Sequence, residues 1–367
     1  MIWPNPHEEV LFFLLGRGLV SVESIVAGKI RIADISSRQR NFGVWRTGES
    51  GYFVKFANAA QPFAAHTIER EAACYWLVRN ESFFDRLKPL LPAFVHYDPK
   101  AAMLVIELIE NGESFFAHLQ RRDPDIAAAV AAQLGTALGT YHFGTPPVGD
   151  RFPQTFPRHI PWAFTFAAPE PAMALHSGPA NAQMLSILNA HKAFHETLTR
   201  LRGEWETRCI IHGDIKFANL LVADGHIRLI DWELVDVGDP CWDAGSVIQS
   251  YLLWWLSSIP IAGQTALDDA VARAAVPLAS LQPALRAFWH AYFRESRLPP
   301  SAARPLLAKC LSLGAMRMLQ SIWEEHLTAP ALKATAILTL QASLNILENP
   351  QAAVEKIFGQ NEATLAA

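Results

Sequence analysis

The sequence predicts an α+β fold in two parts, a smaller N-terminal part at residues 1–109 and a larger, mainly helical part at residues 110–367. From Lys29 to Ser36, apolar and polar side chains alternate, which is typical of a half-buried strand, and two further strand segments separated by polar turns follow up to Phe56. A helical segment follows at residues 65–78. From Leu281 to Phe358, helical segments are separated by proline-containing breaks.

The N-terminal part begins with a short amphipathic helix at residues 7–16. Turns are predicted between the first three strands at the polar residues 37–41 and at Glu49-Ser50-Gly51. A further turn is predicted between the last two strands at Asp98-Pro99-Lys100. The strands are predicted at residues 29–36, 42–46, 52–56, 92–98 and 103–109.

The most informative stretch lies in the middle of the chain. It reads Ile211-His212-Gly213-Asp214-Ile215-Lys216-Phe217-Ala218-Asn219 and continues, after a hairpin, with Leu229-Ile230-Asp231-Trp232-Glu233. Gly213 allows a sharp turn after a short strand that ends at Ile211. Asp224-Gly225 is a strong hairpin signal between residues 220–222 and 226–230. The hairpin therefore brings the oxygen donors of Asn219 and Asp231 together, as Mg²⁺ binding and phosphoryl transfer require.

These motifs resemble those of the aminoglycoside phosphotransferase and choline kinase group within the protein-kinase-like superfamily. The resemblance rests on His212-Gly213-Asp214, Asn219, Ile230-Asp231-Trp232-Glu233 and the later segment Gly238-Asp239-Pro240-Cys241-Trp242-Asp243-Ala244-Gly245. It implies a small lobe with an antiparallel sheet and a helix, and a large helical lobe. It also implies that Asp214 is the catalytic base, that Asn219 and Asp231 bind the metal, and that Asp243 braces the catalytic loop. Lys216 resembles a protein-kinase loop residue that contacts the transferred phosphate.

The same resemblance assigns nucleotide-binding residues to the N-terminal part. Lys55 ends an apolar strand segment, as does the kinase lysine that contacts the α- and β-phosphates, and Glu71 matches the helix glutamate that pairs with it. No Gly-x-Gly-x-x-Gly motif is present in the predicted phosphate loop. Its candidate phosphate contacts are instead Ser36, Ser37, Arg40 and Asn41, and the choice among them stays open. The backbone from Glu107 to Ile109 is the expected adenine contact.

Composition limits the other functional classes. The net charge of −4 gives no electrostatic case for nucleic-acid binding. Four scattered cysteines without a Cys-x-x-Cys motif indicate reduced thiols in the cytoplasm rather than a disulfide framework or a zinc ribbon. The N-terminus has no basic region typical of a signal peptide. Residues 244–266 are uncharged, but polar residues and Pro260 interrupt them, so we expect a buried helix and no membrane span.

Three further features of the C-terminal part bear on the acceptor. Residues 143–179 predict a long surface connection that could close over a substrate. A helix is predicted at residues 181–207, where His191 and His195 have a spacing that suits zinc but is commoner among exposed histidines. Four acidic side chains could line an acceptor pocket that suits a cationic amine, or they could be ordinary surface charges. They belong to Glu233, Asp236, Glu324 and Glu325.

The sequence thus predicts a cytoplasmic enzyme that transfers the γ-phosphoryl group of ATP, with Mg²⁺, to a hydroxyl of a small molecule. Aminoglycosides, amino alcohols, sugars and related metabolites all remain open as acceptors, and GTP remains open as the nucleotide. Two alternatives are a protein or peptide kinase, favoured by Lys216, and a nucleotide-binding scaffold without catalysis. Neither the acceptor nor the oligomeric state follows from these residues.

Overall fold

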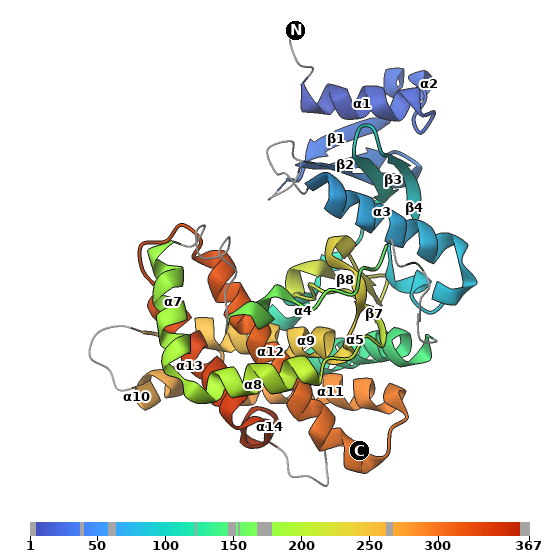
Figure 1. The fold of residues 1–367 in the computed structure, drawn as a ribbon. Helices are drawn as coiled ribbons and strands as arrows, with labels where there is room; N and C mark the ends of the chain where they lie inside the picture. Colours follow the sequence, from blue (N-terminus) through green and yellow to red (C-terminus); the bar gives the residue numbers. More distant parts are fainter. Residues whose placement is uncertain are drawn as a thin grey trace. The chain divides into compact units, whose positions relative to one another are not determined.

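The computed structural model describes residues 5–36, 40–57, 64–121, 123–145, 152, 155–166, 178–261 and 267–359. Contacts divide the chain into two compact units (Figure 1). Unit 1 comprises residues 1–114 together with 219–235, and unit 2 comprises residues 115–218 and 236–367. Each unit has its own sheet and helices and is described by itself.

Unit 1 contains a five-stranded antiparallel sheet in the order β1-β2-β3-β5-β4. All five predicted strands are present, which confirms this part of the prediction. Their bounds are β1 Ile30–Asp34, β2 Arg40–Arg46, β3 Glu49–Phe56, β4 Phe94–Asp98 and β5 Met103–Glu107. The register sets Asn41 opposite Lys55 and Lys55 opposite Leu104, so these three residues share one face of the sheet.

The opposite face of the sheet packs against α1 (Pro6–Gly16). Asn5 caps this helix by accepting the His7 N–H at 3.2 Å. The core between helix and sheet includes the buried side chains of Val10, Leu14, Phe42, Val54 and Val105. Helix α2 (Val22–Val26) was not predicted, because five residues are too few to show a helical period.

The Lys55 face of the sheet packs against α3 (Ala64–Asn80), which confirms the predicted helix in this position. Its buried side chains include Ile68, Ala72 and Tyr75. Helix α3 also packs against a short 3₁₀ segment, Trp232–Leu234, that follows Asp231. Lys55 and the segment after the hairpin therefore both lie against α3.

A second sheet in unit 1 contains the predicted hairpin. Strands β8 (Leu220–Ala223) and β9 (His226–Leu229) pair in antiparallel fashion, and β6 (Glu113–Ser114) adds to the edge of β8. The turn residues Asp224 and Gly225 have φ angles of 51° and 76°. Two positive φ angles are what a type I′ hairpin turn requires, so the hairpin and its turn are as predicted.

Unit 2 is mainly helical (Figure 1). Helix α5 packs along α11, and α12 packs along α9 and α13. Its helices are α4 Phe115–Gln120, α5 Pro124–Gly144, α7 Pro179–Ala190, α8 Lys192–Gly203, α9 Pro240–Ser257, α10 Leu267–Ala272, α11 Leu278–Ser296, α12 Ala303–Glu325, α13 Ala334–Glu348 and α14 Pro350–Phe358. Strands β7 (Cys209–Ile211) and β10 (Asp236–Gly238) form a two-stranded antiparallel sheet.

Helices α9 and α12 approach each other closely at two glycines. A Cβ atom on Gly245 would lie 2.3 Å from the Cys310 carbonyl oxygen, and one on Gly314 would lie 2.6 Å from the Gly245 carbonyl oxygen. Only glycine allows such an approach between backbones. The two helices therefore hold their side chains in a fixed relation beside the loop that follows β7.

The single helix predicted at residues 181–207 is wrong, because the chain forms two helices that meet at His191. This residue has φ −94° and ψ 97°, which is not helical, and it separates α7 from α8. His191 and His195 are therefore not one turn apart on a continuous helix, which removes the geometric basis for a zinc site. Among the described residues, no group of three or more His, Cys, Asp and Glu side chains is placed to hold a metal ion.

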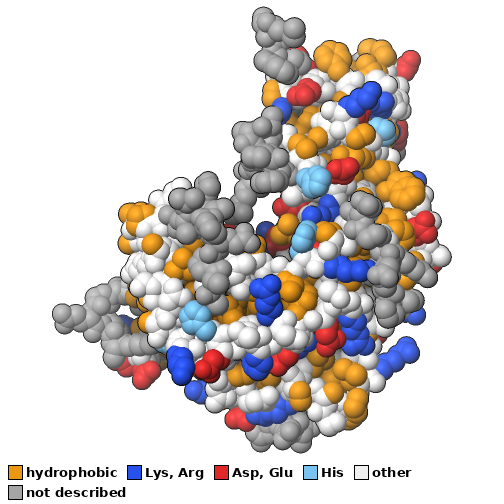
Figure 2. Space-filling model, viewed as in Figure 1, with side chains coloured by type: hydrophobic (Ala, Val, Ile, Leu, Met, Phe, Trp, Pro, Cys, Tyr) orange, Lys and Arg blue, Asp and Glu red, His pale blue; other side chains and the backbone are white. Residues whose placement is uncertain are grey.

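Residues 244–257 of the uncharged segment lie within α9, and most of that helix is buried, as predicted. Residues 262–266 lie outside the described residues. No helix in the described part of the chain has the length and apolar character needed to cross a membrane. On the face of unit 2 visible in Figure 2, basic and acidic side chains are interspersed.

Candidate active site

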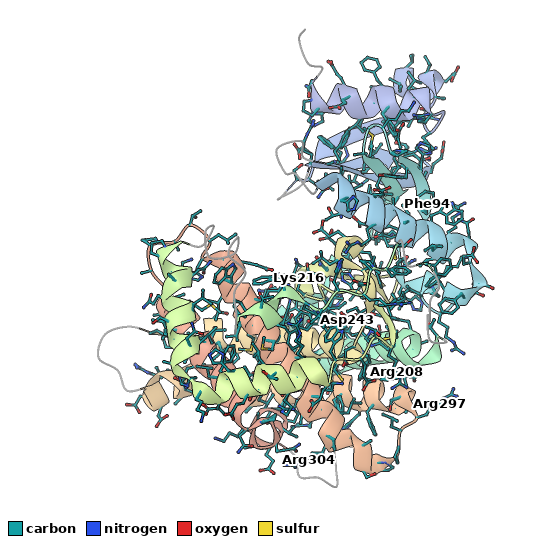
Figure 3. All side chains as sticks on the ribbon, in the orientation of Figure 1. Phe94, Arg208, Lys216, Asp243, Arg297 and Arg304 are labelled. Carbon is teal, nitrogen blue, oxygen red and sulfur yellow. The ribbon has the colours of Figure 1, made fainter. Side chains whose placement is uncertain are left out.

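The loop that carries Asp214 lies in unit 2 and follows β7 directly. Gly213 has φ 82°, a conformation that glycine adopts without strain, and it turns the chain away from the strand. Asp243, on the first turn of α9, accepts the backbone N–H of His212 at 2.7 Å and that of Gly213 at 3.0 Å. The Trp242 indole N–H donates to the Gly213 carbonyl at 3.0 Å. Two consecutive residues of α9 thus hold the backbone just before Asp214. Figure 3 labels Asp243 of α9 and Lys216 of the loop.

Asp243 is itself fully buried. Its carboxylate also accepts the Tyr141 hydroxyl at 2.9 Å and lies 3.3 Å from His142 Nε2. Burial alone would raise its pKa, but the hydrogen bond and charge of His142, with further help from His212, hold the pKa of Asp243 below its usual value. The residue is therefore a buried anion that joins the loop backbone to side chains of α5.

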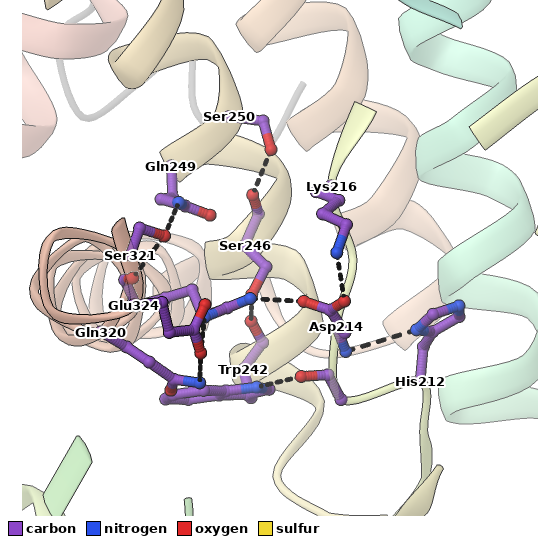
Figure 4. A network of polar contacts seen from close by, with 12 residues as sticks. His212, Asp214, Lys216, Trp242, Ser246, Gln249, Ser250, Gln320, Ser321 and Glu324 are labelled. Carbon is purple, nitrogen blue, oxygen red and sulfur yellow. Dashed lines mark hydrogen bonds and ion pairs between the residues drawn. The ribbon is translucent and has the colours of Figure 1, made fainter. Parts of the chain in front are cut away.

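Asp214 is also buried, with 5% of its surface exposed. Its Oδ2 accepts a hydrogen bond from Lys216 Nζ at 2.6 Å, and its Oδ1 accepts one from Arg317 Nη2 (Figure 4). Burial opposes ionisation, but Arg317 and then Lys216 hold the pKa of Asp214 below its ordinary value. A carboxylate that stays ionised at neutral pH can orient a hydroxyl group and accept its proton.

Arg317 was not predicted as a site residue. It lies on α12, 103 residues after Asp214, and it is buried. The available signal was a single arginine between Met316 and Met318 in an apolar stretch of helix, because arginine is rarely buried unless it is paired. That signal indicates a buried ion pair but does not identify the partner.

The proposed acidic residues of the acceptor pocket have different surroundings. Glu324 Oε1 lies 3.5 Å from Arg317 Nη1 and accepts a hydrogen bond from Gln320 at 2.8 Å (Figure 4). Glu325 is exposed. Asp236 is buried and accepts the backbone N–H groups of Arg158 and His159 at 2.7 and 2.9 Å, so its carboxylate anchors the loop that precedes α7. Of these three proposed pocket residues, Glu324 is thus the one that joins the Asp214 network.

The predicted lysine and glutamate pair with each other in unit 1. Lys55 Nζ lies 2.6 Å from Glu71 Oε2 and 2.5 Å from Asp231 Oδ1. The second oxygen of Glu71 accepts the Trp232 N–H at 3.2 Å. Glu71 therefore connects the lysine on β3 to the backbone that follows Asp231, and both carboxylates share one ammonium group.

Burial and charge act in opposite directions on this group of side chains. Burial disfavours the charged form of Lys55, but Glu71 and Asp231 more than offset this effect and raise the pKa of Lys55. Burial raises the pKa of Glu71 to about 7, because Lys55 offsets it only in part and the Asp231 carboxylate adds to it. The lysine is thus kept as a buried cation.

Asn219 and Asp231 lie at the same end of the β8–β9 hairpin. The Ile230 N–H donates to the Asn219 carbonyl at 3.0 Å, immediately beside the Leu220–Leu229 pair of the ladder. Asp231 has φ 68°, an uncommon backbone conformation for a residue other than glycine. A carboxamide and a carboxylate are oxygen donors of the kind that Mg²⁺ prefers, so the residues at this end of the hairpin fit such an ion.

The predicted phosphate and adenine contacts are spread over unit 1. Asn41 shares the sheet face of Lys55, and its Oδ1 is buried with no hydrogen-bond partner among the described residues. Arg40 donates to Glu9 of α1 at 3.2 Å and lies over the Phe56 ring, on the α1 side of the sheet. Ser37 lies outside the described residues.

The predicted adenine segment follows the last strand of the large sheet. Glu107 ends β5, where its N–H donates to the Ala93 carbonyl at 2.9 Å and its side chain accepts the Ala93 N–H at 3.0 Å. The Leu108 N–H donates to Gly51 at 3.0 Å, and Ile109 follows directly. Glu107 is therefore held in the sheet through both its backbone and its side chain.

Comparison with known proteins identifies the family. The sequence profile of the phosphotransferase enzyme family matches residues 31–300, which is most of the chain. The chain belongs to this family. The match confirms the predicted enzyme class, a kinase-type phosphotransferase with an alcohol group as acceptor.

Solved structures show the same fold for this phosphotransferase. An ethanolamine kinase from Plasmodium vivax matches with a TM-score of 0.60 and 11% identity over 93% of this chain and 89% of its own. A choline kinase from Streptococcus pneumoniae matches with a TM-score of 0.52 and 14% identity over 90% and 98%. A choline kinase from Cryptosporidium parvum matches with a TM-score of 0.52 and 13% identity over 95% and 96%.

No curated protein matches the phosphotransferase in sequence. At the level of the fold, the likeness to these kinases confirms the predicted kinase-like α+β class, and with the family match it confirms the resemblance to aminoglycoside phosphotransferases and choline kinases. The roles of individual residues rest on the geometry of each unit.

Proposed function

We propose that this phosphotransferase transfers the γ-phosphoryl group of ATP, with Mg²⁺, to a hydroxyl group of a small molecule. The observation that carries the proposal is the ammonium group of Lys55, which is buried between the carboxylates of Glu71 and Asp231. A buried lysine held in this way presents a fixed positive charge, and phosphoryl transfer depends on such fixed charges around the phosphates.

In unit 1, Lys55 would neutralise phosphate charge while Glu71 holds it in position. Asn219 and Asp231 would hold Mg²⁺, which supplies charge neutralisation between the phosphates when bound. Lys55 donates to Asp231 in this structure, so metal binding would redirect Asp231 from the lysine to the ion.

The candidate phosphate-binding residues differ in how readily their side chains could reach a phosphate. Asn41 is the favoured phosphate contact, because it shares the sheet face of Lys55 and its side-chain amide N–H group can donate to a phosphate oxygen. Arg40 would first have to leave Glu9. The backbone around Glu107 and Ile109 remains the proposed adenine contact, and the proposed lobe boundary follows Ile109.

In unit 2, Asp214 would orient the acceptor hydroxyl and accept its proton as the phosphoryl group transfers. Its support is the ionised state that Arg317 and Lys216 favour, and the loop backbone that Asp243 fixes. Lys216 has a side chain that is 41% exposed, and it would turn from Asp214 to contact the transferred phosphate. The acceptor would be an aminoglycoside, an amino alcohol, a sugar or a related metabolite, and the enzyme would act in the cytoplasm.

The direct test is release of ADP from ATP and Mg²⁺ over a panel of hydroxylated small molecules, followed by mass spectrometry of the products. We expect a phosphorylated acceptor that disappears in Asp214→Asn. Asp125→Asn is a suitable control, because Asp125 lies exposed in the first turn of α5. Lack of transfer to any acceptor, with unimpaired ATP binding, would favour a nucleotide-binding scaffold.

A protein or peptide kinase remains the second candidate. The observation in its favour is Lys216, which is paired with Asp214 at 2.6 Å in a loop that resembles the protein-kinase loop. Labelled ATP added to a cell lysate separates the two candidates, because a small-molecule kinase leaves the label in the low-molecular-weight fraction. Label found mainly on protein would contradict the proposal.

A further inference from the structure

We propose that Arg317 is a positioning residue for Asp214: from α12 it holds the base carboxylate in place through a buried hydrogen bond and ion pair. This inference rests on the proposed role of Asp214. It adds to the site a residue distant in sequence from the motifs that identify the family. Arg317 need not touch the acceptor, since it would act through Asp214.

Close packing of α12 against α9 determines the position of Arg317. Helix α12 carries Gly314, whose backbone lies against Gly245 of α9 with no room for a Cβ atom on either residue. Helix α9 in turn carries Asp243 and Trp242, which hold the Asp214 loop through its backbone. The arginine and the loop are thus both fixed to the same pair of helices.

The hydrogen bonds of Arg317 are directed at Asp214 rather than at the fold. Nη2 donates to the Asp214 carboxylate, whereas Nε and Nη1 are buried and make no hydrogen bond within the described residues. Nη1 has only the ion-pair distance of 3.5 Å to Glu324. Buried donors in proteins are nearly always satisfied, and each exception needs an explanation, of which a role at a functional site is one. A buried arginine that served only to stabilise the helix packing would be expected to use its remaining donors.

Several charged groups face Asp214 or its loop. Lys216 and His212 belong to the loop itself, Arg317 and beyond it Glu324 belong to α12, and Asp243 reaches the loop backbone from α9. The Lys216 side chain is partly exposed, whereas the Arg317 side chain is only 5% exposed. If Lys216 turns to the transferred phosphate, Arg317 still holds the second oxygen of Asp214. The Arg317 charge lowers the pKa of Asp214, as expected for a cation beside a carboxylate.

Lys309 offers a matched control on the same helix. Its Nζ lies 2.7 Å from Asp239, and that carboxylate caps the N-terminus of α9 by accepting the Cys241 N–H at 2.9 Å. Lys309 thus makes an ion pair from α12 to an aspartate that does not belong to the Asp214 loop. Loss of this pair would disturb helix packing without acting on Asp214.

The experiment is a titration of aspartate carboxyl ¹³C signals by NMR in the full-length protein, with the Asp214 signal identified by its loss in Asp214→Asn. In Arg317→Gln we expect the pKa of Asp214 to rise by about 1 to 3 units. Arg317→Lys should restore most of the shift, and Lys309→Gln should leave the Asp214 pKa at its wild-type value. An unchanged Asp214 pKa in Arg317→Gln would overturn the proposal.

Glu324→Gln tests the same relation without removal of the arginine. Loss of the Glu324 charge should leave Arg317 more fully available to Asp214 and lower the Asp214 pKa further. A rise in the Asp214 pKa in this variant would contradict the proposal, even if Arg317→Gln did not fold. These titrations need neither ATP nor an acceptor. Their outcome is therefore independent of the proposed phosphotransfer, whose failure would appear as the absence of a phosphorylated product.

Discussion

Asp243 and His212 are 31 residues apart in the sequence, yet the Asp243 carboxylate accepts the His212 backbone N–H at 2.7 Å inside unit 2. The same carboxylate accepts the next N–H of the loop and a tyrosine hydroxyl. The conformation of the loop before Asp214 therefore depends on a buried anion supplied by another element.

Replacement of Asp243 should destabilise unit 2. Asp243→Ala leaves the N–H groups of His212 and Gly213 buried without their acceptor, and hydrogen bonds to charged groups contribute about 1.5–3 kcal/mol each. We expect the free energy of unfolding to fall by at least about 3 kcal/mol on this basis. Urea denaturation followed by circular dichroism measures it. If Asp243→Ala lowered the free energy of unfolding no more than a substitution at an exposed residue, such as Asp125→Ala, the bracing role of Asp243 would be contradicted.

The same residue should contribute to the dependence of stability on pH. The pKa of Asp243 is lower in the folded protein than its ordinary value, so its stabilisation is fully present above the unfolded value of about 3.9 and is lost as the pH falls through the folded value. The free energy of unfolding should therefore decline below about pH 4, the unfolded aspartate pKa. Asp243→Asn should lack this part of the decline. An identical pH profile in the variant would show that Asp243 is not the group concerned.

Loss of Lys55 should affect both stability and nucleotide use. Lys55→Met leaves Glu71 and Asp231 without their shared cation, and breaking a buried ion pair costs about 3–5 kcal/mol. We expect lower thermal stability and little stabilisation by ATP with Mg²⁺ in a thermal-shift assay. Lys100→Met, in the turn after β4, is the control. Undiminished stabilisation of the Lys55 variant by ATP would count against the proposed phosphate contact.

Loss of an oxygen donor at the end of the hairpin should raise the Mg²⁺ concentration that the enzyme requires. Asn219→Ala removes one of the two proposed oxygen ligands, and we expect the Mg²⁺ concentration for half-maximal turnover to rise at least about tenfold, as for other losses in metal sites. His226→Ala, at the opposite end of the same hairpin, should leave it unchanged. Turnover measured against Mg²⁺ at saturating ATP distinguishes the two. An equal requirement in both variants would argue against Asn219 as a ligand.

Local patterns predicted much of unit 1. Strand-like segments and turn residues located the strands and the Asp224-Gly225 hairpin, and the resemblance to the kinase family, with the position of each residue on a strand or a helix, led to the Lys55–Glu71 pair. These features depend on residues near each other in sequence or on motifs with fixed spacing. The α7–α8 break at His191 carries no glycine or proline that would mark it, so the prediction continued the helix through it.

Arg317 shows why the remainder of the site was not predicted. Its contact with Asp214 depends on the crossing of α9 and α12 at Gly245 and Gly314, which side-chain periodicity does not report. Asp236 gives a second example, since its carboxylate anchors the backbone near residue 158 from a position 78 residues later. Tertiary packing alone determines which acidic side chains remain available to a ligand.

The central claim is that Asp214 is the group through which this phosphotransferase delivers phosphate to an acceptor hydroxyl. The most direct measurement is single-turnover transfer from γ-labelled ATP to an acceptor found in the panel, for the wild type and Asp214→Asn at equal saturation with ATP and Mg²⁺. We expect a loss in rate of about 100-fold or more, as for removal of a general base, with nucleotide affinity retained. Transfer at the wild-type rate in Asp214→Asn would contradict the account.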